Sequence, residues 1–243
     1  MKFCFNLFKF VIFYFFVCSS FLPAEITRTK DQSGTVIILN GPSAAGKTSI
    51  QNEIQKQAGA LFLKVGIDTF FDALLPTPDL SSFAEKKELK QYTNDHIFIR
   101  GIQLKTDPEG HQIVPLEIGP AGDKVIYGMH AAISAYASKG NNIVVDYILY
   151  KPQWLPDLVQ SLKNTKVYLI GIKTPLPILE EREKKRGTSP VGHARSHYNQ
   201  VHQGFVYDLE IDTSEYTPAQ SAQMILDFIK AHPQPTAMKQ LLH

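Results

Sequence analysis

Residues 41–48 read GPSAAGKT, a GxxxxGKT motif whose residue types and spacing can bind phosphate groups. The apolar, β-branched run 35–40 precedes the motif, and residues 47–58 follow it without proline or glycine. This pattern predicts a buried strand, a loop and a helix, in that order. Such a loop turns its backbone N–H groups into one concavity, at the positive end of the helix dipole. The motif therefore predicts that the chain binds a nucleoside triphosphate.

The side chains of the motif indicate how ATP and Mg²⁺ would be held. Lys47 can reach the β- and γ-phosphates as a point charge, and the Thr48 hydroxyl can ligate a Mg²⁺ ion that bridges them. The alternative is a glycine-rich turn with an exposed lysine. The residues expected to bind the nucleotide are Gly41, Pro42, Ser43, Ala44, Ala45, Gly46, Lys47, Thr48 and Ser49.

Two carboxylates follow or close predicted strands. Asp68 comes directly after the strand 61–65, and Asp146 ends the strand 142–147. A carboxylate at the carboxyl end of a parallel strand can accept the proton of an attacking hydroxyl, or hold Mg²⁺. We expect Asp68 in the first role and Asp146, with Thr48, at the metal. For each aspartate the alternative is a helix N-cap.

Arginines are expected over a transferring phosphoryl group, because its oxygens gather negative charge in the transition state. Arg182 and Arg186 lie four residues apart in the charged run 180–187 and share a helix face. Their position after the fourth predicted strand is typical of the lid of a small kinase. The alternative is a solvated helix whose charges pair with one another.

The order of the predicted elements indicates the fold. Five strands alternate with helices, which predicts an α/β fold of three layers, α/β/α, around a parallel five-stranded sheet. Two extended segments, 98–105 and 112–118, flank the turn 107–110 and predict a β-hairpin insertion. The strands are expected at 35–40, 61–65, 142–147, 166–172 and 207–211. Further helices are expected at 123–139, 154–162, 177–186, 193–203 and 218–231.

Composition is consistent with one domain at residues 25–231, followed by a flexible tail at 232–243. The chain has 243 residues, of which 44% are apolar and 20% charged, enough to bury one sizeable core. The net charge is +2, and Lys2 and Lys9 near the N-terminus supply this excess. The rest of the chain is balanced in charge, so nothing indicates a nucleic-acid partner.

Residues 1–24 resemble a targeting segment. Lys2 and Lys9 precede the apolar run 10–17, which is short for a membrane span. We expect a signal peptide and an exported protein, with an uncleaved membrane anchor as the alternative. Any membrane contact is expected through this segment alone. Both cysteines, Cys4 and Cys18, lie in it, so a chain starting near Glu25 has no thiol chemistry.

Export and a triphosphate site make an unusual pair, because ATP is scarce outside the cytoplasm. Three explanations stay open. The segment could be an anchor that leaves the domain in the cytoplasm, the start site could be misassigned upstream of a cytoplasmic enzyme, or the protein could be delivered into another cell.

Several segments together resemble the chloramphenicol phosphotransferase family. They are the phosphate loop, the GIDTFFDA segment 66–73, the Ile118-Gly119-Pro120 turn, the arginines of 182–187 and the segment 201–213. The resemblance runs from about residue 35 to residue 213. It implies a nucleoside-monophosphate-kinase-like P-loop fold and an ATP-dependent O-phosphotransferase that acts on a hydroxyl of a small molecule.

By position in the family motifs, the resemblance implies that Asp68 is the general base. It also implies that Lys47 and Thr48 hold ATP and Mg²⁺, and that Arg182 and Arg186 close over the phosphates. Two other functions stay open: a zeta-toxin-like kinase that phosphorylates a nucleotide sugar, and an effector that binds a nucleotide without catalysis.

Overall fold

The computed structural model describes residues 33–73, 88–90 and 100–242. They belong to one compact unit, Ser33–His243. The expected signal peptide or anchor at residues 1–24 lies outside the described residues. Among the residues described, no helix combines the length and the apolar character needed to cross a membrane.

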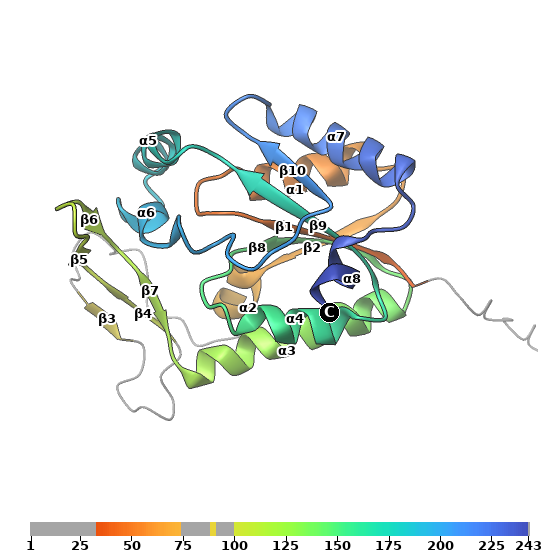
Figure 1. Cartoon of the computed structure of the whole chain (residues 1–243), viewed down its shortest axis with the longest axis horizontal. Coiled ribbons are helices and arrows are strands. Elements are labelled where there is room, and N and C mark those ends of the chain that lie inside the picture. Colours follow the sequence, from red (N-terminus) through yellow and green to blue (C-terminus); the bar gives the residue numbers. More distant parts are fainter. Residues whose placement is uncertain (1–32, 74–87, 91–99, 243) are drawn as a thin grey trace, which may run out of the picture. The chain divides into compact units, whose positions relative to one another are not determined.

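The centre of this unit is a parallel sheet of five strands in the order β10-β9-β1-β8-β2 (Figure 1). The prediction of a parallel five-stranded sheet is confirmed. Because β8 lies between β1 and β2, the carboxyl ends of these three strands meet at one edge. The strands are β1 (Thr35–Asn40), β2 (Phe62–Gly66), β8 (Asn142–Tyr147), β9 (Lys166–Lys173) and β10 (Leu209–Asp212).

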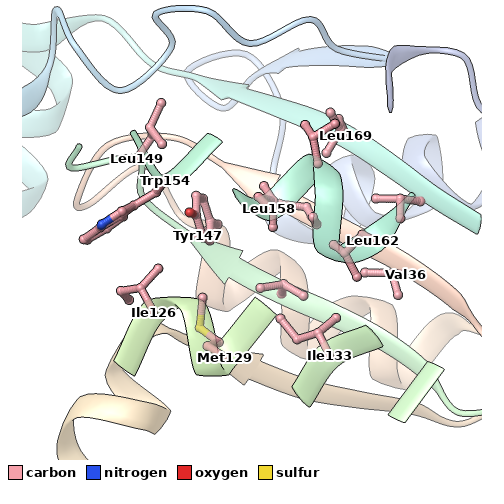
Figure 2. Packing of buried hydrophobic residues seen from close by; sticks show 14 of the residues in the cluster. Val36, Ile126, Met129, Ile133, Tyr147, Leu149, Trp154, Leu158, Leu162 and Leu169 are labelled. Carbon is pink, nitrogen blue, oxygen red and sulfur yellow. The ribbon is translucent and has the colours of Figure 1, made fainter. Parts of the chain in front are cut away.

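Helices cover both faces of the sheet. Alternate residues of β1 enter two separate cores: Val36 and Ile38 pack on one face, whereas Ile37 and Leu39 pack on the other. α3 (Pro120–Ser138) and α4 (Trp154–Leu162) cover the first face, and α1 (Lys47–Gln57) and α7 (Pro218–Ala231) cover the second (Figure 1). Figure 2 shows Tyr147 of β8 among side chains of α3 and α4. Burial on both faces explains the continuous apolar runs of the central strands.

The predicted hairpin insertion is present and more elaborate than expected. β4 (Arg100–Gln103) pairs with β7 (Leu116–Ile118), and β5 (Lys105–Thr106) pairs with β6 (Gln112–Ile113) around the expected turn. A strand that the sequence did not predict, β3 (Glu88–Lys90), adds to the free edge of β4. Residues 98 and 99 of the predicted hairpin lie outside the described residues.

The helix predicted at 193–203 is shorter than expected. α6 (His193–His197) follows α5 (Leu176–Arg186), and the chain then continues as turns to Gly204. Tertiary contacts replace the regular helix there, since the Gln200 amide donates to the Tyr150 carbonyl and the Val201 carbonyl accepts from the Asn40 amide. Residues 67–73, directly after β2, form the short helix α2 (Ile67–Ala73).

The C-terminal segment differs from the flexible tail expected at 232–243. Residues 237–241 form α8 (Ala237–Leu241), and the side chains of Ala237 and Met238 are buried. The Asp208 carboxylate, just before β10, accepts hydrogen bonds from the N–H groups of Thr236 and Ala237 at 2.7 and 3.0 Å. It supplies the acceptor that the start of a helix needs, from a distant part of the sequence.

A buried polar network fixes the end of β1, where the phosphate loop begins. The Asn40 amide donates to the Val201 carbonyl and to the Tyr207 hydroxyl, and its oxygen accepts from the Leu149 N–H. The Tyr207 hydroxyl lies 2.7 Å from His202 Nδ1. Asn40 occupies one lone pair of this hydroxyl, and the hydroxyl can donate its proton to His202 when Nδ1 is unprotonated. His202 is therefore part of the hydrogen-bond network that supports the phosphate loop.

We predict that this network makes the stability of the protein sensitive to acid. Burial, with smaller effects of Lys173 and Lys47, lowers the pKa of His202 to about 4. In the unfolded chain the pKa is about 6.5. The unfolded state therefore binds more protons between these values, so the stabilising contribution is complete above pH 6.5 and is lost as the pH falls towards 4. Urea unfolding between pH 7.5 and pH 4.5 measures this loss.

The His202→Gln variant should lose part of the acid sensitivity, because glutamine can accept the same hydrogen bond without titrating. His232→Gln, at an exposed position, is the matched control and should keep the wild-type pH dependence. Equal pH dependence in all three proteins would contradict the assignment to His202.

Candidate active site

The site lies at the sheet edge where β1, β2 and β8 end. The phosphate loop follows β1, Asp68 lies at the start of α2 after β2, and Asp146 pairs in register with Leu39 of β1 and Gly66 of β2. Asp146 is part of β8, and α2 begins at Ile67, one residue before Asp68. These positions give neither aspartate the N-cap role that the sequence left open.

A cavity of about 640 Å³ opens at this edge. Its lining includes most of the residues singled out from the sequence: Ser43, Ala44, Gly46, Lys47, Thr48, Ser49, Asp68, Asp146, Arg182 and Arg186. The lining carries five cationic side chains and two carboxylates, which favours an anionic ligand. Gly41, Pro42 and Ala45 are not part of the lining and form the base of the loop.

The backbone of the loop has the shape of an anion cradle. Ala44 has φ 62° and Gly46 has φ 89°, both in the left-handed region that L-residues rarely adopt. Holding a non-glycine residue there costs about 1–2 kcal/mol, which the surrounding structure must supply. Gly46 precedes α1 and has no side chain that could cap it. The first residues of α1 line the cavity, so the uncapped N-terminus of this helix lies at its wall.

Asp146 binds both polar side chains at the start of α1. The Thr48 hydroxyl donates to Asp146 Oδ2 at 2.5 Å, and Lys47 Nζ lies 3.4 Å from Asp146 Oδ1. Lys47 also donates to the Pro42 carbonyl at 2.8 Å, and its side chain is only 5% exposed. A buried ammonium group needs such partners. The arrangement brings a hydroxyl, a carboxylate and a cation to one point, as a nucleotide site requires.

Arg182 reaches the loop through Thr213. The guanidinium group donates to the Thr213 hydroxyl at 3.0 Å and to its carbonyl at 2.6 Å. The Thr213 hydroxyl in turn donates to the Ala45 carbonyl. Arg182 thus lines the cavity and, through Thr213, also supports the phosphate loop. Thr213 is a residue of the site that we did not single out from the sequence.

Arg186 and His197 both form hydrogen bonds with Ser43. Arg186 donates to the hydroxyls of Ser189 and Ser43, at 2.5 and 3.3 Å. The Ser43 N–H donates to His197 Nε2 at 3.0 Å, so this loop amide is already paired within the protein. Burial, followed by the neighbouring His193, holds the pKa of His197 well below its usual range. A neutral imidazole is what an accepting Nε2 requires.

Tyr150 and His193 also line the cavity, and the sequence gave no motif for either. The Tyr150 hydroxyl lies 3.1 Å from His193 Nε2. Burial raises the pKa of Tyr150 well above its usual range, and the carboxylates of Asp68 and Asp146 add to this effect. Tyr150 therefore faces the cavity as a neutral phenol. Its place shortly after Asp146, just beyond β8, is the signal that could have found it.

The segment after α5 joins the arginines to the hairpin insertion. The buried Glu183 carboxylate accepts from the N–H groups of Gly192 and Ala194, both at 2.8 Å. The Gly192 carbonyl accepts from the Val114 N–H of the hairpin, and His193 Nδ1 donates to the Val114 carbonyl. The wall that carries Arg186 and the wall built by the hairpin are thus held together.

A family model matches most of the chain. Residues 34–230 match the family model "Chloramphenicol phosphotransferase-like protein". The chain is 28% identical over 209 residues to the protein named "Putative O-phosphotransferase" in two strains of Mycobacterium tuberculosis, which covers 86% of this chain and 88% of that protein.

Solved structures show the same fold. The APS kinase CysC of M. tuberculosis, in complex with AMPPNP and APS, has a TM-score of 0.54 and 13% identity, and covers 82% of this chain and 99% of its own. A sugar kinase from Janibacter sp. has a TM-score of 0.52 and 15% identity, and covers 82% of this chain and 95% of its own. At these identities the likeness concerns the fold alone.

We predict that the Gly192→Ala substitution destabilises the protein by about 1–2 kcal/mol or more. Gly192 has φ +96°, and an added Cβ would lie 2.4 Å from the Gln112 carbonyl oxygen. Denaturant unfolding measures the effect. Gly128→Ala is the matched control, since Gly128 is exposed within α3 and an added Cβ meets nothing within 4 Å. Alanine should stabilise that helix slightly. Equal effects of the two substitutions would contradict the close contact at Gly192.

Proposed function

Since the chain belongs to the chloramphenicol phosphotransferase-like family, we propose that it is an ATP-dependent O-phosphotransferase that transfers the γ-phosphate to a hydroxyl of a small molecule. The observation that carries the proposal is that Asp68 and the phosphate loop line the same cavity. A general base and a triphosphate site are the two parts that this reaction needs side by side.

The cations of the cavity supply the electrostatic part of the reaction. The N-terminus of α1 faces the phosphates, and Lys47 moves from Asp146 and the Pro42 carbonyl to the β- and γ-phosphates when ATP binds. Arg186 and Lys185 line the same cavity and balance the charge that builds up on the transferring group. Arg182 also contributes positive charge, and its hydrogen bond to Thr213 helps to hold the phosphate loop in place.

Thr48 and Asp146 fit Mg²⁺ as a cofactor. Their oxygens lie 2.5 Å apart, and a hydroxyl together with a carboxylate is the hard donor set that this ion prefers. When bound, Mg²⁺ would neutralise phosphate charge and help to orient the triphosphate. Asp146 would hold the ion together with Thr48, and Lys47 would then be available to the phosphates.

Asp68 would act as the general base. The substrate hydroxyl donates its proton to the Asp68 carboxylate as its oxygen attacks the γ-phosphorus, and the bond between this phosphorus and the β,γ-bridging oxygen breaks. The products are the phosphate ester and ADP. Asp68 is exposed at the start of α2, within the lining of the cavity, where a substrate can reach it.

We predict that Asp68→Asn abolishes most alcohol-dependent ADP release and leaves ATP binding intact. Asparagine keeps the shape of the side chain but does not accept a proton at neutral pH, and general base catalysis typically contributes 10²–10⁴-fold. The measurement is ADP release with Mg-ATP and a panel of alcohols that includes chloramphenicol and nucleotide sugars, together with calorimetric ATP binding.

Asp227→Asn is the control, because Asp227 is an exposed acid on α7 that pairs only loosely with Lys230, at 3.8 Å. It should behave as the wild type does. Full activity of Asp68→Asn would contradict the base assignment. If ATP binds but no alcohol stimulates ADP release by the wild type, the chain is a nucleotide-binding protein without this activity.

A further inference from the structure

The hydroxyl of Tyr150 lies in the cavity wall and donates its proton to a hydrogen bond within the protein. Its oxygen lies 3.1 Å from His193 Nε2, and His193 Nδ1 lies 2.9 Å from the Val114 carbonyl oxygen. A carbonyl only accepts hydrogen bonds, so His193 must carry its proton on Nδ1. Nε2 of a neutral His193 is then an acceptor, and the Tyr150 hydroxyl must be the donor to it.

With its proton donated to His193, the Tyr150 hydroxyl can offer a ligand only the lone pairs of its oxygen. A phenol that donates its one proton within the protein can still accept hydrogen bonds on its oxygen. The geometry of Val114, His193 and Tyr150 therefore converts an ambivalent hydroxyl into an acceptor. The relay begins in the hairpin insertion and ends in the cavity, so the hairpin determines the polarity of the site.

Tyr150 lines the cavity together with Asp68 and a group of apolar side chains. Asp68 lies near enough to add to the rise in the pKa of Tyr150, and the half-buried side chains of Ile102, Leu116 and Ile148 are apolar parts of the same lining. Asp68 also presents acceptor oxygens. A substrate in this part of the cavity meets two separate acceptors and an apolar surface.

Resting on the proposed function, we infer that Tyr150 selects the acceptor substrate. It accepts a hydrogen bond from a second donor of the substrate, an O–H or N–H group other than the hydroxyl that is phosphorylated at Asp68. The substrate class is then an alcohol with an apolar body and at least one further hydrogen-bond donor, such as a diol, an amino alcohol or an amido alcohol. Tyr150 is a specificity-determining residue.

A ring that only packs would behave differently. The Tyr150 ring contacts Trp154, His193 and His197, with centroids 6.4, 5.9 and 5.0 Å away. Phenylalanine preserves these contacts and removes only the hydroxyl, so Tyr150→Phe separates the role of the hydroxyl from that of the ring. Thermal unfolding of the variant checks that the fold is intact.

Three probes that share one apolar body test the selection: 1-phenyl-1,2-ethanediol, 2-methoxy-2-phenylethanol and 2-phenylethanol. The diol offers a second donor, the ether offers only an acceptor there, and the mono-alcohol offers neither. Phosphate-ester formation from Mg-ATP is measured with the full chain. The wild type should prefer the diol over the other two by about fivefold to tenfold in kcat/KM, the effect of one hydrogen bond.

In Tyr150→Phe the preference should disappear through a higher KM for the diol, while the KM for ATP stays within about twofold. In a second variant, His193→Phe, the Tyr150 proton is released towards the cavity, so the ether should gain relative to the mono-alcohol. Loss of packing alone would not raise the activity on the ether relative to the mono-alcohol.

The inference is overturned if the wild type shows no preference among the probes, transfers phosphate to none of them, or if Tyr150→Phe keeps the preference. A change in the KM for ATP alone would also overturn it, by assigning Tyr150 to the nucleotide. The proposed function fails separately, if the wild type releases no more ADP than Asp68→Asn with any alcohol of the panel.

Discussion

The contact of Asp146 with Lys47 and Thr48 is the interaction on which the site depends. Lys47 is almost completely buried, and an ammonium group in that position is stable only with a close acceptor. The Pro42 carbonyl accepts from this ammonium group at 2.8 Å, and Asp146 supplies the opposite charge at 3.4 Å. Asp146 can do so because β8 lies between β1 and β2 and brings its carboxylate beside the first turn of α1. The same register places Asp68 at the neighbouring strand end. Sheet order therefore determines which side chains meet at the cavity.

Around this fixed edge, the remaining walls come from segments that are far apart in the sequence. Glu183 binds the backbone of the segment that carries His193, and that segment binds the hairpin at Val114. Arg195 adds a second connection, since it lies 2.6 Å from Glu180 and 3.6 Å from Asp107 of the hairpin turn. The segment after α5 and the hairpin insertion are thus linked by direct contacts.

The sequence predicted the parts of the fold that follow from local pattern. Apolar runs and helical spacing identified the five parallel strands and most of the helices, and the GxxxxGKT motif identified the phosphate loop. Features that need distant partners were not predictable. α8 depends on the Asp208 carboxylate, the shortened α6 on contacts of Gln200 and Val201, and β3 on pairing with β4.

The same limit holds for the site. Asp68 and Asp146 were found because strand ends carry ligands in parallel sheets, and Arg182 and Arg186 because of their spacing on a helix. Tyr150, His193 and Thr213 have no spacing that marks them, since their roles arise only from hydrogen bonds across the fold. The resemblance to a family covered Thr213 as part of a motif but gave it no role.

Direct transfer of the γ-phosphate from ATP to an alcohol, in a single displacement, is tested most directly by the stereochemistry at phosphorus. The γ-position of ATP is made chiral with sulfur and oxygen isotopes, and the configuration of the phosphate-ester product is determined with the full chain and an alcohol that stimulates ADP release. We predict inversion, because a single in-line attack by the hydroxyl inverts the phosphorus once. Retention would contradict this mechanism, since it requires two displacements and a phosphorylated side chain as intermediate.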